Sequence, residues 1–543
     1  MKGRILAVAF IFSLAFASLV FQLYEIQIVK NSFFSARAES QIKLSGYLEA
    51  KRGGIYFTDR EGNLIQAASN KDYTIVFASP KQIVSREEAA AALAPILNID
   101  EKELAQRFSK KTSYELLASK ITEGQADKIR SLRLKGIFID TKEFRFYPFG
   151  NLAANVLGFV GPSSKDSQIR GRYGIEAFYD ERLNGKAGVL EKDKVIDPDQ
   201  GEDIVLTIDR FIQSQAEEIL EKAVANNKAS GGTIIVQEPA TGKILALANL
   251  PSFDPDNYSS YKLGDFINPA VQAIYEPGSV FKVITMAAGI DSGKLTPETE
   301  FNDTGSFVLN NRTITNYQNK AYGKVTMKDV IANSINTGAV FVVRKIGHDT
   351  FFNYAIKFGF DDKTGIDLPG ELRGDFRRLK NNPKDINFAT ASFGQGLAVT
   401  PIQLINAVSA IANGGELMKA YITEDSKTER IRRVVKPETA ALVRDMMVGA
   451  VKKAGAIQIP GYAIAGKTGT AAIPDFKKGG YTDEFVHTFA GFAPAAKPRF
   501  TILVKIDSPQ VGPLAGFTVV PAFAELAQFA LNYYGVSPDD IQP

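Results

Sequence analysis

The sequence predicts an α/β (α+β) fold: a central antiparallel sheet flanked by helices, preceded by an extended mixed module and one N-terminal transmembrane helix. Near residue 231 and again near residue 488, apolar β-branched runs flank short turns, which is the pattern of a β-hairpin. Between these hairpins, from about residue 265 to 455, helical patterns dominate. Strands at both ends of a domain with helices between them indicate one sheet that is completed late in the chain.

Composition and charge exclude several classes of function. The chain has 543 residues, of which 45% are hydrophobic and 23% charged, as expected of a globular protein with two or more folded units. A formal net charge of +4 without a basic run predicts no nucleic-acid partner. The absence of cysteine excludes disulfides and thiolate metal sites, and two histidines are too few for a histidine cluster. We therefore expect no metal ion.

An uncharged apolar run at residues 5–24 predicts a membrane anchor. At about 1.5 Å per residue, a helix of this length spans the ~30 Å hydrocarbon core of a bilayer. Lys2 and Arg4 precede it, so the positive-inside rule predicts a cytoplasmic stub at residues 1–4 and an extracytoplasmic remainder. The alternative is a cleaved signal peptide with an A-x-A site at residues 15–17. Because the apolar run continues past that site, we expect an uncleaved, single-pass anchor in the plasma membrane.

Two domains are predicted after the anchor. Residues 25–200 mix strand-like runs such as DYTIVFAS, helical patches such as REEAAAALAPIL and many turn residues, which indicates an extended pedestal module. A polar cluster at residues 197–203 marks its end, and residues 201–543 form the second domain. Near the start of this domain, apolar residues recur at helical spacing. They are Ile212, Ala216, Ile219, Leu220 and Ala223.

The stretch YEPGSVFKVITMAAGI brings a serine and a lysine within one helical turn. Residues 277–278 interrupt the preceding structure, and the apolar pattern that follows predicts a buried helix. Ser279 and Lys282 then share one face of its first turn, where a neutral lysine can take the proton of a serine nucleophile. The alternative is a capping serine beside a solvated lysine. The same S-x-x-K spacing occurs at residues 40–43 and 259–262, so spacing alone does not decide between them.

Two further polar segments indicate which of the three S-x-x-K copies belongs to a catalytic site. Ser334 and Asn336 lie in a break between apolar helical runs, in the sequence NSINTG. Residues 467–470 read Lys-Thr-Gly-Thr, at the end of an apolar strand that the last hairpin can pair with. A second Lys-Thr-Gly at residues 363–365 has no strand pair after it. We therefore expect the copy at 467 to join the site.

The order S-x-x-K, S-x-N, K-T-G is the signature of penicillin-recognising serine acyltransferases. Stretches such as FYPFGNLAANVLGFVG, TGKILALANLPSFDPDNY, YEPGSVFK, FGQGLAVTPIQL and GKTGTA resemble class B penicillin-binding proteins. The similarity covers nearly the whole chain from the anchor on, and the residues around Ser279 are more similar to the division (septal) type. The resemblance implies a monofunctional D,D-transpeptidase of peptidoglycan synthesis, with a penicillin-binding transpeptidase domain after a dimerisation-like pedestal.

The resemblance also implies a role for each residue of the first two motifs. Ser279 would attack the carbonyl between the last two D-alanines of a stem peptide, releasing D-alanine and leaving an acyl-enzyme. Lys282 would be the base, and burial together with the like charge of Lys467 would depress the pKa as this role requires. Ser334 would pass the proton to the leaving amine, and Asn336 would hold the substrate amide.

The third motif is implied to bind the substrate. Thr468 and Thr470 would hydrogen-bond the terminal carboxylate, and Gly469 would let the substrate backbone lie against the strand edge. Backbone N–H groups of Ser279 and Thr470 would form the oxyanion hole. No metal or cofactor is needed. His487, at the start of the last hairpin, is interpreted as a strand residue near the site and not as a catalyst.

The resemblance implies the partners as well. Peptidoglycan stem peptides are the expected substrates, and β-lactam antibiotics are expected to bind covalently. No glutamate-centred glycosyltransferase motif precedes residue 200, which speaks against a bifunctional enzyme. A separate membrane glycan polymerase and other division proteins are therefore the expected protein partners.

Two other functions are considered. A β-lactamase or D,D-carboxypeptidase would pass the acyl group to water, and a class A β-lactamase would need a glutamate in an E-x-x-x-N pattern. The candidate, Glu371, has Asp375 four residues on. A β-lactam sensor would need more cytoplasmic chain than the predicted stub, and an inactive scaffold would be expected to lack a motif residue. We therefore favour the transpeptidase.

Overall fold

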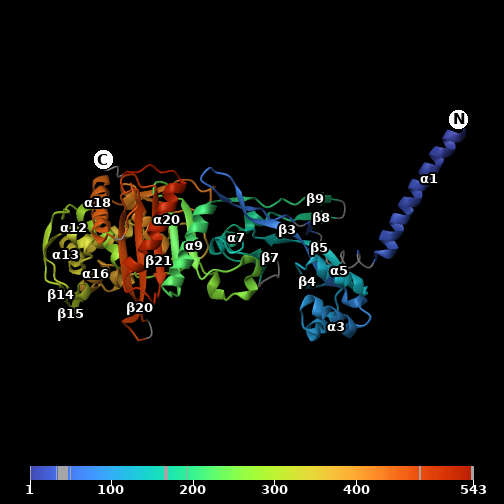
Figure 1. Cartoon of the computed structure of the whole chain (residues 1–543), viewed down its shortest axis with the longest axis horizontal. Helices are drawn as coiled ribbons and strands as arrows, with labels where there is room; N and C mark the ends of the chain where they lie inside the picture. The colour runs from blue at the N-terminus through green and yellow to red at the C-terminus, as the bar shows by residue number, and fades with distance from the viewer. Residues whose placement is uncertain are drawn as a thin grey trace. The chain divides into compact units, whose positions relative to one another are not determined.

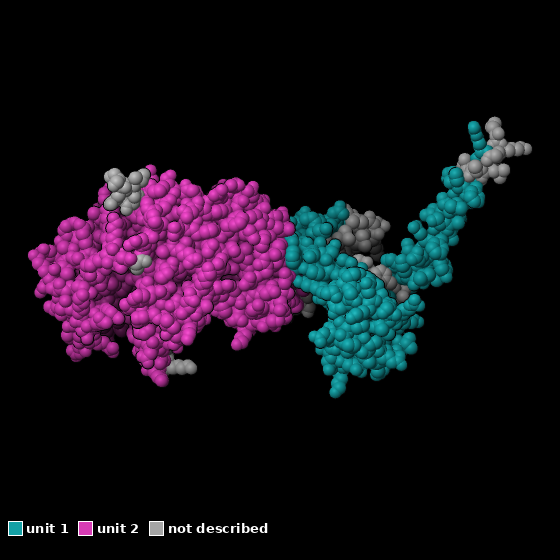
Figure 2. Space-filling model, viewed as in Figure 1, with its two compact units in different colours: residues 1–53, 69–146, 184–202 teal, residues 54–68, 147–183, 203–543 magenta. Residues whose placement is uncertain are grey.

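The computed structural model describes residues 2–31, 34, 47–48, 50–163, 169–191, 194–455, 457–475 and 478–539. Its contacts divide the chain into two compact units (Figure 2). The first contains residues 1–53, 69–146 and 184–202, and the second contains residues 54–68, 147–183 and 203–543. Two stretches that precede residue 184 therefore pack with the larger, C-terminal unit.

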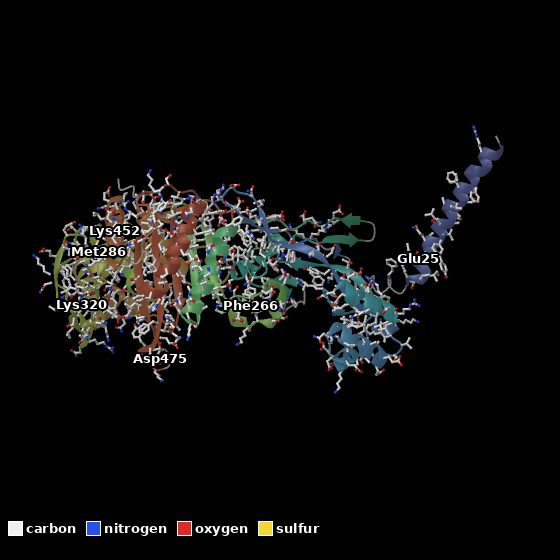
Figure 3. The ribbon with its side chains drawn as sticks, viewed as in Figure 1. Glu25, Phe266, Met286, Lys320, Lys452 and Asp475 are labelled. Atoms are coloured by element: carbon white, nitrogen blue, oxygen red, sulfur yellow. The ribbon has the colours of Figure 1, made fainter. Side chains whose placement is uncertain are left out.

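The chain begins with helix α1, Lys2–Tyr24, which continues into a π-helical turn at Glu25–Val29 (Figure 1; Glu25 is labelled in Figure 3). The segment Phe10–Val29 is long and apolar enough to cross a membrane, and none of it is buried. Exposed phenylalanines such as Phe12 and Phe21 are unfavourable in water and favourable in a hydrocarbon layer. Within the described part of the chain, this is the one helix with the composition of a membrane span.

In the first unit, a small antiparallel sheet is covered by helices. Strand β3 (Ile65–Ala78) pairs through its residues 69–78 with β5 (Ile137–Phe146) and also with β4 (Glu115–Ala118). The helices are α3 (Arg86–Leu97), α4 (Glu101–Phe108) and α5 (Glu123–Leu132). Their shared core with the sheet contains Val76, Ala90, Leu93, Leu104 and Phe108. The strand-like run and the helical patch predicted in this region coincide with β3 and α3.

The second unit is built on a five-stranded antiparallel sheet with the strand order β12-β11-β21-β20-β19. Figure 1 shows β20 and β21, late in the chain, beside elements from the start of the unit. The strands are β11 (Gly231–Gln237), β12 (Ile244–Leu250), β19 (Ala465–Pro474), β20 (Tyr481–Ala493) and β21 (Phe500–Asp507). The predicted fold class is confirmed, including the late completion of the sheet.

Side chains of this sheet contribute to two separate cores. Because successive side chains of a strand point to opposite faces, Ile235 belongs to one apolar cluster while Ile234 and Val236 belong to the other. The first cluster includes α11 (Lys282–Asp291) and α17 (Pro401–Ala412); the second includes α9 (Arg210–Asn226) and α20 (Val520–Tyr533). The five apolar positions predicted for the α9 segment are all buried. The sheet is thus covered by helices on both faces.

Two small antiparallel sheets of two strands each interrupt the helical region between the outer strands. Strand β13 (Glu300–Asp303) pairs with β16 (Gly323–Thr326), and β14 (Ser306–Leu309) pairs with β15 (Arg312–Thr315). Asn310 and Asn311 both have positive φ, 47° and 57°, as a two-residue type I′ turn requires. The helical pattern of residues 265–455 predicts helices here, and these strands give no periodic signal because each is only four residues long.

Candidate active site

Ser279 lies in a 3-10 turn, Gly278–Phe281, that leads directly into α11. Gly278 has a positive φ of 55°, and its N–H donates to the carbonyl of Gly394 at 3.1 Å. This contact fixes the turn against the FGQGLAVTPIQL segment. The hydroxyl of Ser279 is half-buried and makes no hydrogen bond to the part of the chain that the structure describes. It is therefore available to a ligand.

Lys282 joins the first two motifs. Its side chain is 1% exposed. Its Nζ atom donates to the carbonyl oxygen of Ser334 at 2.6 Å and to Asn336 Oδ1 at 2.7 Å, and it lies 3.2 Å from Ser334 Oγ. A surface lysine beside a capping serine would instead be solvated, so the structure excludes that alternative for this pair.

Ser334 has a strained backbone conformation that orients its carbonyl group toward Lys282. Ser334 has φ 56°, in the left-handed region that serine rarely adopts. This residue separates α12 (Met327–Ala332) from α13 (Asn336–Ile346) and directs its carbonyl toward Lys282. Such strain persists only where surrounding contacts maintain it, and it is enriched at functional sites.

The amide of Asn336 is oriented by a contact on its far side. Asn336 Nδ2 donates to the carbonyl of Thr315 at 2.8 Å, so Oδ1 is the atom that faces Lys282. Thr315 ends strand β15 of the β14–β15 hairpin. The hairpin that sequence reasoning missed therefore sets the direction of a motif side chain.

The third motif lies on β19, which is the edge strand of the sheet. Lys467 is buried, and its Nζ donates to the carbonyl of Thr468 at 3.1 Å. A Cβ atom on Gly469 would come within 2.7 Å of the carbonyl oxygen of Pro277. The strand can therefore lie against the Ser279 turn only because position 469 has no side chain.

The two threonines of this motif differ in their surroundings. Thr468 Oγ1 lies 3.5 Å from Lys467 Nζ, whereas Thr470 Oγ1 accepts a hydrogen bond from Ala515 N at 3.4 Å. Both side chains are half-buried. A hydroxyl that accepts from a neighbour still has its own proton to donate, so either can bind an anionic group.

Burial favours the neutral form of both lysines at this site. It lowers the pKa of Lys282 well below its ordinary value, and the positive charge of Lys467 lowers that pKa further. Burial also lowers the pKa of Lys467, to about 8. Since one pKa unit corresponds to about 1.4 kcal/mol, these environments shift protonation by a chemically significant amount. Lys282 is therefore suited to accept a proton near neutral pH.

The other copies of the S-x-x-K and Lys-Thr-Gly patterns differ from the site in their surroundings. In the Lys363–Gly365 copy, the N–H and hydroxyl of Thr364 both donate to Glu371 Oε1 at 2.6 Å, and Gly365 N donates to Glu371 Oε2 at 3.1 Å. The carboxylate considered for a β-lactamase therefore holds this loop. Ser259 and Lys262 are exposed. The copy at residues 40–43 lies outside the described residues.

His487 is a buried strand residue. It is paired in register with Thr470, and its Nδ1 lies 2.8 Å from Thr518 Oγ1. Burial lowers the pKa of His487 to about 4, so the ring is neutral at pH 7. These contacts agree with its interpretation as a strand residue near the site.

Sequence reasoning missed a buried carboxylate behind the second motif. Asp303 is 2% exposed and accepts hydrogen bonds from Thr337 Oγ1 at 2.5 Å and from Asn316 Nδ2 at 2.8 Å. Asn316 and Thr337 directly follow Thr315 and Asn336, whose contact orients the motif amide. Asp303 therefore holds both sides of that contact. An isolated aspartate in a short strand gives no pattern by which it could have been found.

A second missed carboxylate lies directly before the Ser279 turn. Glu276 is 8% exposed; its Oε1 accepts from Gly396 N at 2.9 Å and its Oε2 accepts from the hydroxyl of Tyr481 at 3.1 Å. Burial raises the pKa of Glu276. The contact ties the first residue of β20 to the segment that carries the nucleophile.

Within the described residues, no group of three or more histidine, aspartate or glutamate side chains is arranged to hold a metal ion.

Comparisons with known proteins agree with this geometry. Residues 232–528 match the family "Penicillin binding protein transpeptidase domain", and residues 47–206 match "Penicillin-binding Protein dimerisation domain". Stage V sporulation protein D of Bacillus subtilis (strain 168) is 32% identical over 567 residues, which cover 97% of this chain and 86% of that protein. Peptidoglycan D,D-transpeptidase FtsI of Escherichia coli (strain K12) is 30% identical over 550 residues, covering 97% and 91% respectively.

Solved structures share the fold. A peptidoglycan synthetase from Bifidobacterium adolescentis aligns with a TM-score of 0.71 at 24% identity over 92% of this chain and 98% of that one. Penicillin Binding Protein 2X from Streptococcus thermophilus aligns with a TM-score of 0.72 at 22% identity, over 90% and 81%. The two matched domains define a penicillin-binding protein. The chain belongs to that family and, within it, to the class B proteins of the division type, which confirms the resemblance seen in the sequence.

Proposed function

We propose that this protein is a serine D,D-transpeptidase that cross-links peptidoglycan stem peptides through an acyl-enzyme on Ser279, in septal wall synthesis. The observation that carries the proposal is the buried Lys282 amine, within hydrogen-bond distance of Ser334 and Asn336 and one helical turn from Ser279. The similarity to the Escherichia coli protein named peptidoglycan D,D-transpeptidase FtsI supports it. Covalent binding of β-lactams at Ser279 belongs to the same proposal.

Acylation begins at the hydroxyl of Ser279. Its oxygen bonds to the carbonyl carbon between the last two D-alanines as its proton moves to Lys282 Nζ. The negative charge on the carbonyl oxygen is stabilised by the N–H groups of Ser279 and Thr470, and such donors contribute ~10²–10³-fold each. The carbon–nitrogen bond then breaks, and the terminal D-alanine leaves as an amine.

The leaving nitrogen needs a proton, and the contacts of Lys282 indicate its route. A neutral Lys282 has two N–H groups, which donate to Ser334 O and Asn336 Oδ1, and one lone pair, which takes the serine proton. Ser334 Oγ, 3.2 Å from Nζ, then relays this proton to the departing amine. Lys282 is neutral again at the end of the step.

The second half of the reaction reverses these transfers. An amine from a neighbouring stem bonds to the ester carbonyl, loses a proton to Lys282, and displaces Ser279, which recovers its proton. In the first half, before D-alanine leaves, Thr468 and Thr470 hold its carboxylate, with Lys467 supplying positive charge beside them. The site residues thus divide into nucleophile, base, relay and carboxylate binders.

The surroundings of the site belong to the proposal as well. The anchor helix would leave a cytoplasmic stub at residues 1–4 and place the transpeptidase domain, residues 201–543, on the extracytoplasmic side of the plasma membrane. A pedestal at residues 25–200 would lie between them. A separate membrane glycan polymerase and other division proteins are the proposed partners, because a cross-linking enzyme acts on strands that another enzyme makes.

Amine capture distinguishes this function from hydrolysis. The full chain in detergent, given a peptide ending in D-Ala-D-Ala and an amine acceptor, should release D-alanine and form the new amide, detected by mass spectrometry. Ser279→Ala should abolish both products, and Lys282→Ala should slow both strongly. Release of D-alanine without any amide product, even at high acceptor concentration, would indicate a carboxypeptidase instead.

A further inference from the structure

A large cavity continues from the site along β19. It has a volume of about 1270 Å³, and its walls come from several separate parts of the second unit. One wall is formed by residues 471–474 of β19 with Tyr481, a second by residues 375–390 and a third by residues 312–314 of β15, and the rest of the lining comes from residues within 269–276, 396–401, 480–486 and 505–507. Asp475, labelled in Figure 3, follows the last wall residue of β19 at the hairpin tip.

The position of the Ser279 turn shows which part of a ligand this cavity receives. A Cβ on Gly278 would lie 3.2 Å from both Thr470 O and Ala471 Cβ, so the turn that carries Ser279 lies against residues 470–471 of β19. The carboxylate end of the substrate lies at Thr468 and Thr470, on one side of that point. The portion on the other side of the scissile bond, the acyl part, must therefore continue past Ala471 into the cavity. The free edge of β19 offers backbone groups to an extended chain there.

The cavity has more positive than negative charge available to a ligand. Five cationic side chains and three carboxylates line it: Arg312, Arg377, Arg378, Lys384 and Lys505, with Glu276, Asp375 and Asp507. Each carboxylate already has a partner in the protein, because Glu276 binds Tyr481, Asp375 pairs with Arg377, and Asp507 pairs with Lys505.

Three of the cations are not neutralised. Arg312, Arg378 and Lys384 make no ion pair within 4.0 Å among the residues that the structure describes, and all three are exposed to the cavity's solvent. The guanidinium of Arg378 lies close to the nucleophile segment: its Nη1 would be 3.9 Å from a Cβ on Gly396, whose N–H binds Glu276. Burial raises the pKa of Glu276, and the positive charge of Arg378 acts in the opposite direction with a smaller effect.

We propose that this cavity selects acyl donors that are anionic upstream of the scissile bond, with Arg378 and Lys384 on one wall and Arg312 on another binding their carboxylates. The inference rests on the proposed function and deepens it, since it names the charge of the donor chain. Guanidinium groups bind carboxylates through paired hydrogen bonds, and the three carboxylates that line the cavity already have partners in the protein, so Arg312, Arg378 and Lys384 can bind those of a ligand. The alternative is that these three side chains are ordinary solvated surface groups. The rate of acylation would then not depend on the charge of the ligand.

Two penicillins that differ by one carboxylate test this directly. Benzylpenicillin and its α-carboxy derivative share the ring system and differ only in charge on the acyl side chain, which enters the cavity. The second-order rate constant of acylation of the full chain is measured for each by stopped-flow or intact-mass kinetics. The quantity of interest is the ratio of the two rate constants, carboxylated over neutral.

In the wild type, raising the salt concentration should lower this ratio, because screening weakens exposed charge pairs. Arg378→Gln and Lys384→Gln should each lower it about two- to fivefold, the range expected for an exposed ion pair. Lys324→Gln is the matched control: this lysine is exposed in the same unit, pairs with Glu300 and does not line the cavity. It should leave the ratio unchanged.

The outcomes separate this inference from the function on which it rests. If benzylpenicillin acylates the wild type normally but the ratio is the same in all variants and at all salt concentrations, charge selection is wrong and the transpeptidase proposal stands. If benzylpenicillin does not acylate the wild type at all, the proposed function fails and this inference with it. A ratio that falls only in Arg378→Gln and Lys384→Gln supports both.

Discussion

Lys282 Nζ lies 2.7 Å from Asn336 Oδ1, although the two residues are 54 positions apart in the chain. The contact exists because Thr315 holds the other end of the asparagine amide and because Ser334 adopts a left-handed backbone. Each motif therefore depends on residues outside it.

The pH dependence of acylation should depend on Lys467. Only neutral Lys282 accepts a proton, so the acylation rate should rise as pH rises through the pKa of Lys282 and then level off. The charge of Lys467 lowers the pKa of Lys282, so Lys467→Met should move this rise to higher pH. Lys452→Met, at an exposed position on α18 (Pro437–Ala454), should not move it. A rise at unchanged or lower pH in Lys467→Met would contradict the coupling.

Asp303 should act as a positioning residue. Asp303→Asn weakens the hold on Thr337 and Asn316 and should slow acylation by benzylpenicillin about tenfold, since small misplacements of reacting groups have large kinetic costs. Asp367→Asn is the matched control, because Asp367 is also buried and accepts hydrogen bonds from Ile422 N and Thr423 Oγ1.

Two readouts separate positioning by Asp303 from a general loss of stability. Melting temperatures of the Asp303→Asn and Asp367→Asn variants should fall by similar amounts, while only the first loses acylation rate. Thr337→Ser, which keeps the hydroxyl, should acylate faster than Thr337→Val. Equal rate losses in the two aspartate variants would refute a specific role for Asp303.

Gly469 should tolerate no side chain. An alanine Cβ would lie 2.7 Å from Pro277 O, so in Gly469→Ala the strand or the Ser279 turn must shift. We expect acylation to slow by about 10²-fold, as for other displacements near reacting atoms. Gly449→Ala on α18 is the control, because nothing lies within 4 Å of its added Cβ. An unchanged rate in Gly469→Ala would show that this close approach does not matter for the chemistry.

His487 should make stability depend on pH. The folded-state pKa is about 4 and the ordinary value is 6.5, so the unfolded state binds more protons between these values. Stability contributed by the neutral ring is fully present above pH 6.5 and is lost as pH falls toward 4, by about 3 kcal/mol in total.

Replacing the ring of His487 tests this point. The free energy of unfolding of the wild type should fall more steeply between pH 6.5 and 4 than that of His487→Gln. If the slopes of His487→Gln and the wild type coincide, the buried ring does not titrate as described.

Long periodic segments were predictable from the sequence. The five apolar positions of α9 and the paired runs of β11 with β12 and β20 with β21 follow from spacing alone, because burial of one face imposes a period. The order of the three motifs likewise pointed to one site. Each of these signals lies within a short stretch of the sequence, so it can be recognised without knowledge of the fold.

Contacts between distant segments were not predictable in this way. The β14–β15 hairpin is too short for a periodic signal, although its Asn310-Asn311 turn was a usable cue. Nothing near Asp303 or Glu276 indicates their partners, which come from segments far along the chain. Gly469 was assigned to substrate approach, whereas the structure also shows protein atoms in the space its side chain would need.

An ester between Ser279 and the acyl donor can be observed as a change in mass. The intact protein is incubated with benzylpenicillin, its mass is measured, and the modified peptide is identified by digestion and tandem mass spectrometry. We expect a mass increase of one penicillin on the peptide that contains Ser279, and none in Ser279→Ala. Modification of Ser279→Ala to the same extent, or of a peptide around residues 363–365, would contradict it.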